Sequence, residues 1–143
     1  MNKIDINKSW NYAAAAESTA HIQLKSKYDL FINGQFVKPV SKKYFNTVNP
    51  ANGEQISKLA QANEKDVDKA VKAARKAFKS WSNLEAKERG KYIFRIARMI
   101  QERAKEFAVI ESLDGGKPIR ESRDIDIPLA ANHFFYYAGW ADK

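Results

Sequence analysis

The stretch NEKDVDKAVKAARKAFKSW, residues 63–81, is where the sequence changes from a strand pattern to a helix pattern. Its apolar residues recur at intervals of three and four, which places them on one side of a helix. Asn63 directly precedes this pattern and is a favourable N-cap, because its side-chain oxygen can accept a hydrogen bond from a first-turn amide. Five lysines fall on the opposite side: Lys65, Lys69, Lys72, Lys76 and Lys79. The stretch therefore predicts an amphipathic helix.

The residues before this helix favour short strands and tight turns. In YDLFINGQFV, residues 28–37, Asn33 and Gly34 separate two β-favouring runs, a pattern typical of a type I′ hairpin. A further strand, YFNTV at 44–48, leads into the turn-forming NPANGE at 49–54. We predict a small β-meander over residues 28–62, which needs a cover on one face because so slight a sheet is not stable alone.

The residues after the first helix predict two more helices. SNLE, residues 82–85, has the spacing of a capping box, and the apolar stripe that follows predicts one helix of about 28 residues ending near Leu113. Gly115 and Gly116 are expected to end it. A third helix is expected to start near Pro128, because proline is well tolerated at the first helical position. The chain alone is thus expected to be a partial α+β piece, with residues 63–143 helical.

The two ends of the chain raise the question of a partner. Residues 1–27 show little periodicity and are expected to form an extension lying on another surface, with Trp10 and Tyr12 as contacts. The sequence HFFYYAGWADK, residues 133–143, carries five aromatic side chains, each able to bury about 150 to 250 Å². We therefore expect exposed apolar surface that binds dye or self-associates unless another polypeptide covers it.

Composition limits the function classes. The chain has 143 residues, 44% of them apolar, and a formal net charge of +8, which permits an acidic partner without selecting one. It contains no cysteine, which excludes disulfides, thiolate metal sites and a cysteine nucleophile within these residues. No stretch has the length and apolarity of a signal-peptide core or a membrane span, so we expect a cytoplasmic protein with no membrane partner.

Few residues suggest chemistry by themselves. The two histidines, His21 and His133, are far apart in sequence, and no glycine-rich phosphate-binding motif occurs. Asp114 is expected at a helix C-terminus, where the helix dipole disfavours a negative charge, so it needs Lys117 or a bound cation nearby. Asp126 follows Glu121 and Asp124 in an expected loop, where it could cap the third helix or take part in catalysis.

The lysine side of the first helix supports an alternative from a different class. A small basic module that binds nucleic acid or an anionic surface would associate in a salt-sensitive way, and replacing Lys69, Lys72 and Lys76 with glutamine would weaken that association. A solvated helix face explains the same lysines, since no interleaved aromatic residue and no arginine lies on that side of the helix. Nucleic acid is therefore the less favoured partner.

Five motifs in order resemble the N-terminal part of the aldehyde dehydrogenase family. They are LFINGQFV at 30–37, TVNPANGE at 47–54, KDVDKAVKAARKAF at 65–78, ERGKYIFRIARMIQERAKEFAVIESLDGGKP at 88–118 and YYAGWADK at 136–143. The resemblance implies an α/β fold with a Rossmann-like cofactor domain in the full-length family. It covers about residues 28–143 and leaves residues 1–27 outside.

The resemblance implies NAD- or NADP-dependent oxidation of an aldehyde to a carboxylic acid in a complete homo-oligomeric enzyme. In that chemistry a cysteine thiolate attacks the aldehyde, hydride passes to the nicotinamide, and a glutamate activates water to hydrolyse the thioester. All these groups lie downstream of the matched region in the family, so no catalytic or cofactor-binding residue is expected here. The implied partner is the remainder of the polypeptide, and a regulatory subunit docking on a full-length dehydrogenase is a further alternative.

The resemblance also places two sites on this chain. Relatives bind a monovalent cation through backbone oxygens and a carboxylate in two motifs that match Thr47, Val48 and Asp114, which implies part of a Na⁺ or K⁺ site. Asp126 and Leu129 match positions near the mouth of the substrate tunnel in some relatives. Loop capping and core packing are the structural alternatives for these last two residues.

Overall fold

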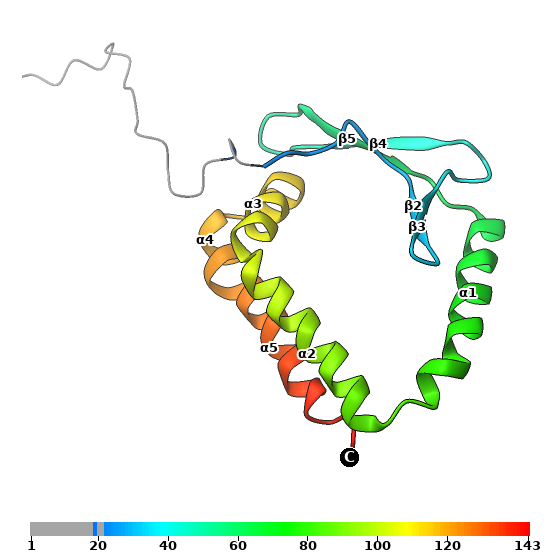
Figure 1. Ribbon diagram of the computed structural model, residues 1–143. Coiled ribbons are helices and arrows are strands. Elements are labelled where there is room, and N and C mark those ends of the chain that lie inside the picture. The colour runs from blue at the N-terminus through cyan, green and yellow to red at the C-terminus, as the bar shows by residue number, and fades with distance from the viewer. Residues whose placement is uncertain (1–18, 20–21) are drawn as a thin grey trace, which may run out of the picture.

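The computed structural model describes Thr19 and residues 22–143, and Figure 1 shows how their elements are arranged. Trp10, Tyr12 and His21, and with them most of the expected extension, lie outside the described residues. The strands are β1 (Lys27–Tyr28), β2 (Leu30–Ile32), β3 (Gln35–Val37), β4 (Tyr44–Val48) and β5 (Gln55–Ala60). The helices are α1 (Glu64–Ser82), α2 (Ala86–Glu102), α3 (Ala104–Gly115), α4 (Ile119–Glu121), the π-helical turn η2 (Ser122–Asp126) and α5 (Ile127–Ala138).

The strands form two small sheets, where the sequence predicted one meander. β2 and β3 make the predicted hairpin, with φ of 53° at Asn33 and 77° at Gly34, as a type I′ turn requires. The other sheet has the order β1-β5-β4, with β1 parallel and β4 antiparallel to β5. The loop after β3 lies between the two sheets. Its Val40 amide donates to the Asp66 carboxylate of α1, so the chain leaves the hairpin here and does not pair with a neighbouring strand.

The first helix follows the prediction at its start. The side chain of Asn63 accepts a hydrogen bond from the Asp66 amide, and the Asp66 carboxylate accepts one from the Asn63 amide, which completes a capping box. Asp66 is buried, with 2% of its surface exposed. Its carboxylate therefore both caps α1 and anchors the loop before β4.

The second predicted helix differs from the structure at its start and in the middle. The chain breaks at Arg103, with φ −107° and ψ 18°, so α2 and α3 replace one long helix. The predicted capping box at Ser82 is wrong, since Ser82 ends α1 and its hydroxyl donates to the Lys79 carbonyl. Gly116 takes the predicted left-handed conformation, with φ of 70°, at the end of α3.

The segment before α5 is helical and not a loop. Residues of α4 and η2 continue directly into α5, so the first-turn amides of α5 already have backbone partners in the preceding turns. Asp126 has helical backbone angles and forms no side-chain cap, which corrects the predicted capping role. Pro128 lies in the first turn of α5, as the sequence predicts.

The best-packed part of the described chain is the α2 and α5 pair. Figure 1 shows these helices side by side, while α1 stands apart and joins them only through the connection before α2. The rings of Phe94 and Phe135 meet edge to face at 4.9 Å across the pair. The buried apolar residues among those described are small: Ala97, Ala108, Val109 and Ala131.

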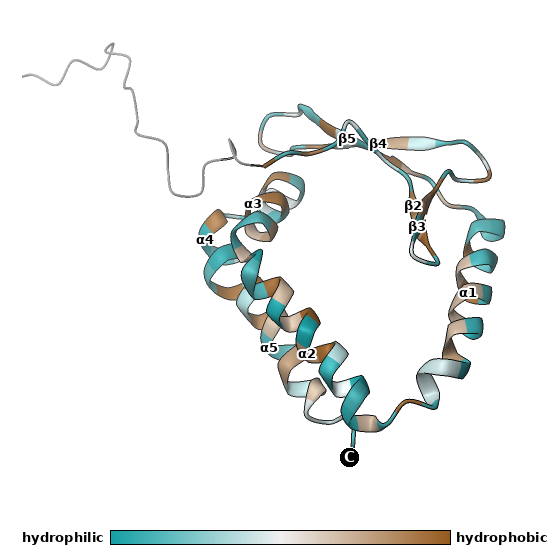
Figure 2. Cartoon of the chain, in the orientation of Figure 1, coloured by the Kyte–Doolittle hydropathy of each residue, from teal (hydrophilic) through white to brown (hydrophobic). Residues whose placement is uncertain are grey.

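Large apolar side chains are mostly exposed. The aromatic cluster near the C-terminus behaves as the sequence predicts, with 62% of Tyr137 and 54% of Trp140 exposed. Phe78 on α1 and the paired rings of Phe31 and Phe36 on the hairpin are each more than 60% exposed. Figure 2 shows apolar residues along α1 and on the hairpin that faces it. These faces are suited to contact with another polypeptide surface.

Candidate functional site

The end of α3 meets the turn between β4 and β5, and this junction holds the predicted cation ligands. The turn is stiffened by its own side chains: Asn49 accepts a hydrogen bond from the Ala51 amide at 2.9 Å, and Asn52 accepts one from the Glu54 amide at 3.0 Å. At Gly116 an added Cβ would lie 2.6 Å from Cγ of Pro50. Glycine is thus required both by the left-handed φ and by this close approach.

Two of the three predicted cation ligands meet at this junction. The hydroxyl of Thr47, on β4, donates a hydrogen bond to Oδ1 of Asp114, near the end of α3. Val48 follows Thr47 at an irregularity in the pairing of β4 with β5, and 47% of it is exposed. The junction therefore brings a hydroxyl and a carboxylate together across 67 residues of sequence. Oxygen ligands of this kind suit a hard cation, although no group of three acidic, histidine or cysteine residues gathers anywhere in the described chain.

Lys117 has a different partner from the one that the sequence suggested. Its ammonium group donates to Asp126 and lies 3.8 Å from Oε1 of Glu111, whereas Asp114 bonds to Thr47. The hydrogen bond to Asp126, with the nearby negative charges, raises the pKa of Lys117. The pair ties the segment after α3 to the start of α5. Sequence reasoning missed this contact because it placed Asp126 in a loop.

The predicted tunnel-mouth residues lie at the start of α5. Asp126 precedes the helix and its carboxylate is occupied by Lys117. Leu129 is on the first turn, with 48% of its surface exposed. The start of α5 thus presents an exposed apolar side chain and a carboxylate that is paired with an ammonium group.

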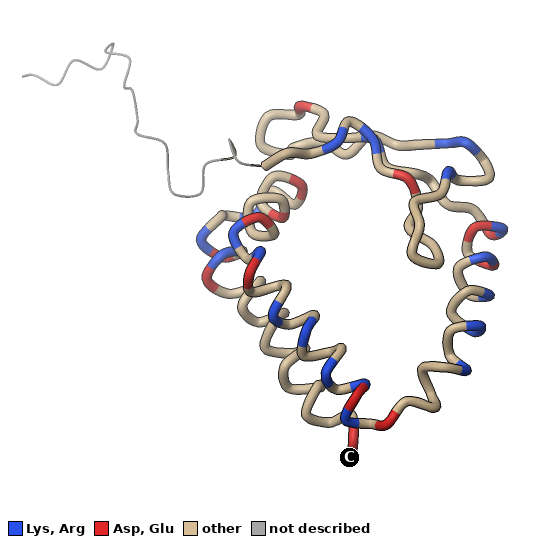
Figure 3. Tube along the Cα trace, in the orientation of Figure 1, with Lys and Arg blue, Asp and Glu red and all other residues tan. Residues whose placement is uncertain are grey.

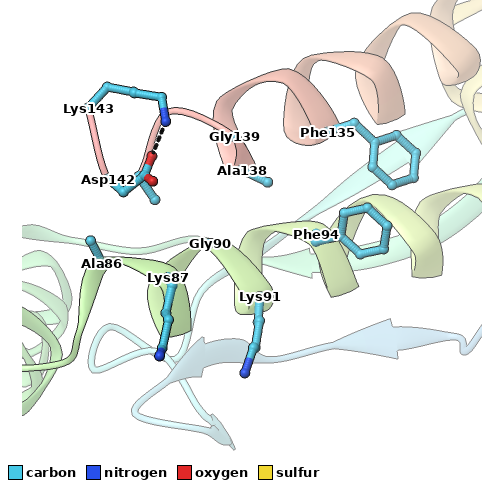
Figure 4. A pocket seen from close by; sticks show the side chains of 11 residues that line it. Ala86, Lys87, Gly90, Lys91, Phe94, Phe135, Ala138, Gly139, Asp142 and Lys143 are labelled. Atoms are coloured by element: carbon cyan, nitrogen blue, oxygen red, sulfur yellow. Dashed lines mark hydrogen bonds and ion pairs between the residues drawn. The ribbon is translucent and has the colours of Figure 1, made fainter.

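A pocket of about 500 Å³ lies between α2 and the C-terminal residues (Figure 4). Phe94 and Phe135 line its apolar end, and small residues together with three lysines and Asp142 line the rest. These lysines are paired with nearby carboxylates: Lys91 lies 2.7 Å from Glu88 and Lys143 lies 2.8 Å from Asp142. The pocket therefore has an apolar surface for packing but no arrangement of nucleophile and base.

Tyr44 forms a polar contact that the sequence did not indicate. Its hydroxyl donates to Oδ1 of Asp29 at 2.6 Å, and the ammonium group of Lys27 lies 3.6 Å from the centre of its ring. The hydrogen bond to Asp29, together with desolvation and the charge of that carboxylate, raises the pKa of Tyr44 to about 12. The contact fixes β4 to the chain that precedes β2.

We expect the titration of Tyr44 to appear at unusually high pH. Since the folded-state pKa lies above the ordinary value of 10.0, the contact stabilises the fold below about pH 10, and that contribution is lost as the pH rises toward 12. The difference in tyrosinate absorbance between the wild type and Tyr44→Phe should centre near 12. Asp29→Asn should return it toward 10, whereas a difference centred near 10 in the wild type would contradict this prediction.

Comparison with known proteins agrees with this fold and with the order of its motifs. Residues 36–143 match the aldehyde dehydrogenase family. The chain is 45% identical over 122 residues to the provisionally assigned aldehyde dehydrogenase DhaS of Bacillus subtilis (strain 168), covering 84% of this chain and 25% of that protein. It is 39% identical over 128 residues to an acetaldehyde dehydrogenase of Pseudomonas aeruginosa, covering 90% of this chain and 25% of that protein.

A solved structure gives the same result. The NAD⁺ complex of an aldehyde dehydrogenase from Bacillus cereus superposes with a TM-score of 0.78 at 40% identity, covering 83% of this chain and 26% of that one. The chain belongs to the aldehyde dehydrogenase family, a family of oxidoreductases. It corresponds to the N-terminal part of these relatives and spans about a quarter of their length. The comparisons give no support to a nucleic-acid-binding module or a separate regulatory subunit.

No helix in the described part of the chain is long and apolar enough to cross a bilayer.

Proposed function

We propose that this chain is the N-terminal segment of an NAD- or NADP-dependent aldehyde dehydrogenase and contributes to aldehyde oxidation only together with the rest of that polypeptide. The observation that carries this proposal is the continuous family match over residues 36–143, combined with a share of about a quarter of each relative. The nucleophile must come from the remainder, because this chain has no cysteine.

The exposed apolar faces support binding to that remainder. α1, the hairpin and the end of α5 each present large side chains to solvent, while the described apolar core consists of three alanines and one valine. Covering these faces would remove further apolar surface from water, which favours association. We further propose a homo-oligomer in the cytoplasm for the complete protein, in line with the family resemblance.

The chain itself is not proposed to bind the dinucleotide. It has no glycine-rich motif that would hold a pyrophosphate at a helix N-terminus. The residues present therefore do not fit NAD, and we assign the cofactor site to the rest of the polypeptide. Acetaldehyde is a suitable first substrate to test, because one relative is an acetaldehyde dehydrogenase.

Two smaller sites belong to the same proposal. Thr47, Val48 and Asp114 would contribute oxygen ligands to a monovalent cation, and the contact between Thr47 and Asp114 supports this. At the start of α5, Leu129 would form an apolar wall of the substrate tunnel, while Asp126 holds Lys117 in place.

Fragment complementation tests the proposed function. We expect the 143-residue chain alone to show no NAD-dependent oxidation of acetaldehyde, because it lacks a thiol nucleophile. Co-expressed with the remaining portion of the Bacillus cereus relative, it should co-purify with that portion and produce NADH. Replacing Na⁺ and K⁺ by choline should lower the activity or thermal stability of the complex if the cation site is occupied.

The controls are each portion assayed alone and a complex whose catalytic cysteine is replaced by serine. Turnover by the isolated chain would contradict the assignment of the nucleophile to the remainder. Failure of the two portions to form a complex would contradict the proposal that the exposed apolar faces bind the rest of the polypeptide.

A further inference from the structure

A pocket of about 520 Å³ lies where the loop after β3 meets the beginning of α1. Four lysines line it, Lys27 from β1, Lys38 and Lys42 from the loop, and Lys69 from α1. Figure 3 shows basic residues in this loop, close to the N-terminal end of α1. Lys69 is one of the five lysines on one side of α1, whereas the other three lysines of the pocket come from earlier segments of the chain. The fold therefore concentrates positive charge that the sequence disperses.

These lysines lack carboxylate partners within the part of the chain that the structure describes. Two carboxylates contact residues of the pocket wall, and both already accept hydrogen bonds from groups other than these lysines. Asp29 accepts the hydroxyl proton of Tyr44, and Asp66 accepts the Val40 and Asn63 amides. Among the residues that the structure describes, the ammonium group of Lys27 lies 3.6 Å from the centre of the Tyr44 ring. The four lysines that line the pocket thus outnumber the two carboxylates that contact its wall.

The backbone of the loop offers few further donors. The Lys42 amide donates to the Pro39 carbonyl at 2.9 Å, and the Lys43 amide donates to the Ser41 hydroxyl at 3.2 Å. Lys42 has φ of 56°, in the left-handed region that favours glycine. A ligand here would therefore be held by ammonium groups and not by a nest of amides. Lysine acts as a flexible point charge, so such a pocket selects the number of charges on an anion more than its shape.

We propose that this lysine pocket binds a small phosphate-bearing anion with two or more negative charges. Its volume lies within the range of pockets that hold small molecules. An anion bound there would supply an opposite charge to lysines that have no carboxylate partner within the described residues. The proposal is independent of aldehyde oxidation, since the pocket contains none of the residues assigned to the cation or tunnel sites.

Titration of the 143-residue chain with inorganic pyrophosphate at low ionic strength, followed calorimetrically, tests the proposal. We expect saturable binding that weakens as salt is added. Lys38→Gln and Lys69→Gln should each raise the Kd by about fivefold, as expected for losing one close charge pair in water. The matched control is the double variant Lys72→Gln and Lys76→Gln, which removes two charges from the same helix outside the pocket. It should leave the Kd nearly unchanged.

A further variant separates binding from folding. Lys42→Gly removes a pocket charge but relieves the left-handed backbone, so it should weaken pyrophosphate binding while keeping or raising the urea midpoint of unfolding. Absence of pyrophosphate binding would overturn the proposal. Equal weakening in the control double variant would also overturn it, because the attraction would then come from the whole basic surface.

Discussion

Replacing Asp66 with alanine is expected to lower the free energy of unfolding by about 3 to 4 kcal/mol. The Asp66 carboxylate is buried and accepts hydrogen bonds from the Val40 amide, at 3.1 and 3.2 Å, and from the Asn63 amide, at 3.1 Å. Alanine would leave these amides without an acceptor, and charged hydrogen bonds are among the stronger contributions to stability. The same change removes half of the capping box of α1.

The effect should be seen as a fall in the urea midpoint, with loss of order in the loop before β4. Asp68→Ala is a matched control, because it removes the same charge from an exposed position on the same helix. We expect the control to change stability by no more than about 0.5 kcal/mol. Equal effects of the two substitutions would show that net charge, and not the buried hydrogen bonds, explains the loss.

Replacing Gly90 with alanine is expected to destabilise the α2 and α5 pair by about 2 to 3 kcal/mol. Gly90 is buried on α2, and an added Cβ would lie 2.8 Å from the Ala138 carbonyl oxygen and 3.6 Å from Cβ of Ala141. The carbonyl is part of the backbone and cannot rotate away as a side chain can. The two helices must therefore separate, which also disturbs the contact between Phe94 and Phe135.

Thermal unfolding followed by circular dichroism measures this loss, and Gly115→Ala provides the control. Gly115 is helical, and a Cβ there would meet nothing within 4 Å. Since alanine is the better helix former, we expect Gly115→Ala to be neutral or stabilising by up to about 1 kcal/mol. A loss for Gly115→Ala as large as that for Gly90→Ala would contradict the explanation by close helix packing.

Several parts of the fold that local chemistry controls agree with prediction, although the local capping box expected at Ser82 does not form. The Asn33 and Gly34 turn, the cap at Asn63, the left-handed Gly116 and the early proline of α5 all depend on residues close in sequence. One prediction differs because the side chain bonds to a residue outside the local motif. Asp126 was expected to cap a helix, but Lys117 binds its carboxylate and the chain before α5 is already helical.

The predicted functional sites likewise divide into features that the sequence indicates and contacts that only the folded chain creates. Motif order was sufficient to indicate the aldehyde dehydrogenase family, and the family match confirms it. The hydroxyl of Thr47 donates to Asp114, which brings these two residues together, while the cation site that the resemblance implied remains a prediction. The lysine pocket had no sequence signal, because its four lysines belong to three separate segments and only Lys69 was part of a recognisable pattern.

By itself the sequence determined the order of a strand region before a helical region, the turn residues at Asn33 and Gly34, the family and the absence of a thiol nucleophile, because each depends on residue type or on spacing along the chain. Only the tertiary structure decided that the strands divide into two sheets, that Asp66 joins the loop to α1, and that Lys117 pairs with Asp126. The physical reason is that a buried or charged group bonds to whichever complementary group the folded chain brings within reach. The spacing of residues along the sequence does not show which partner that will be.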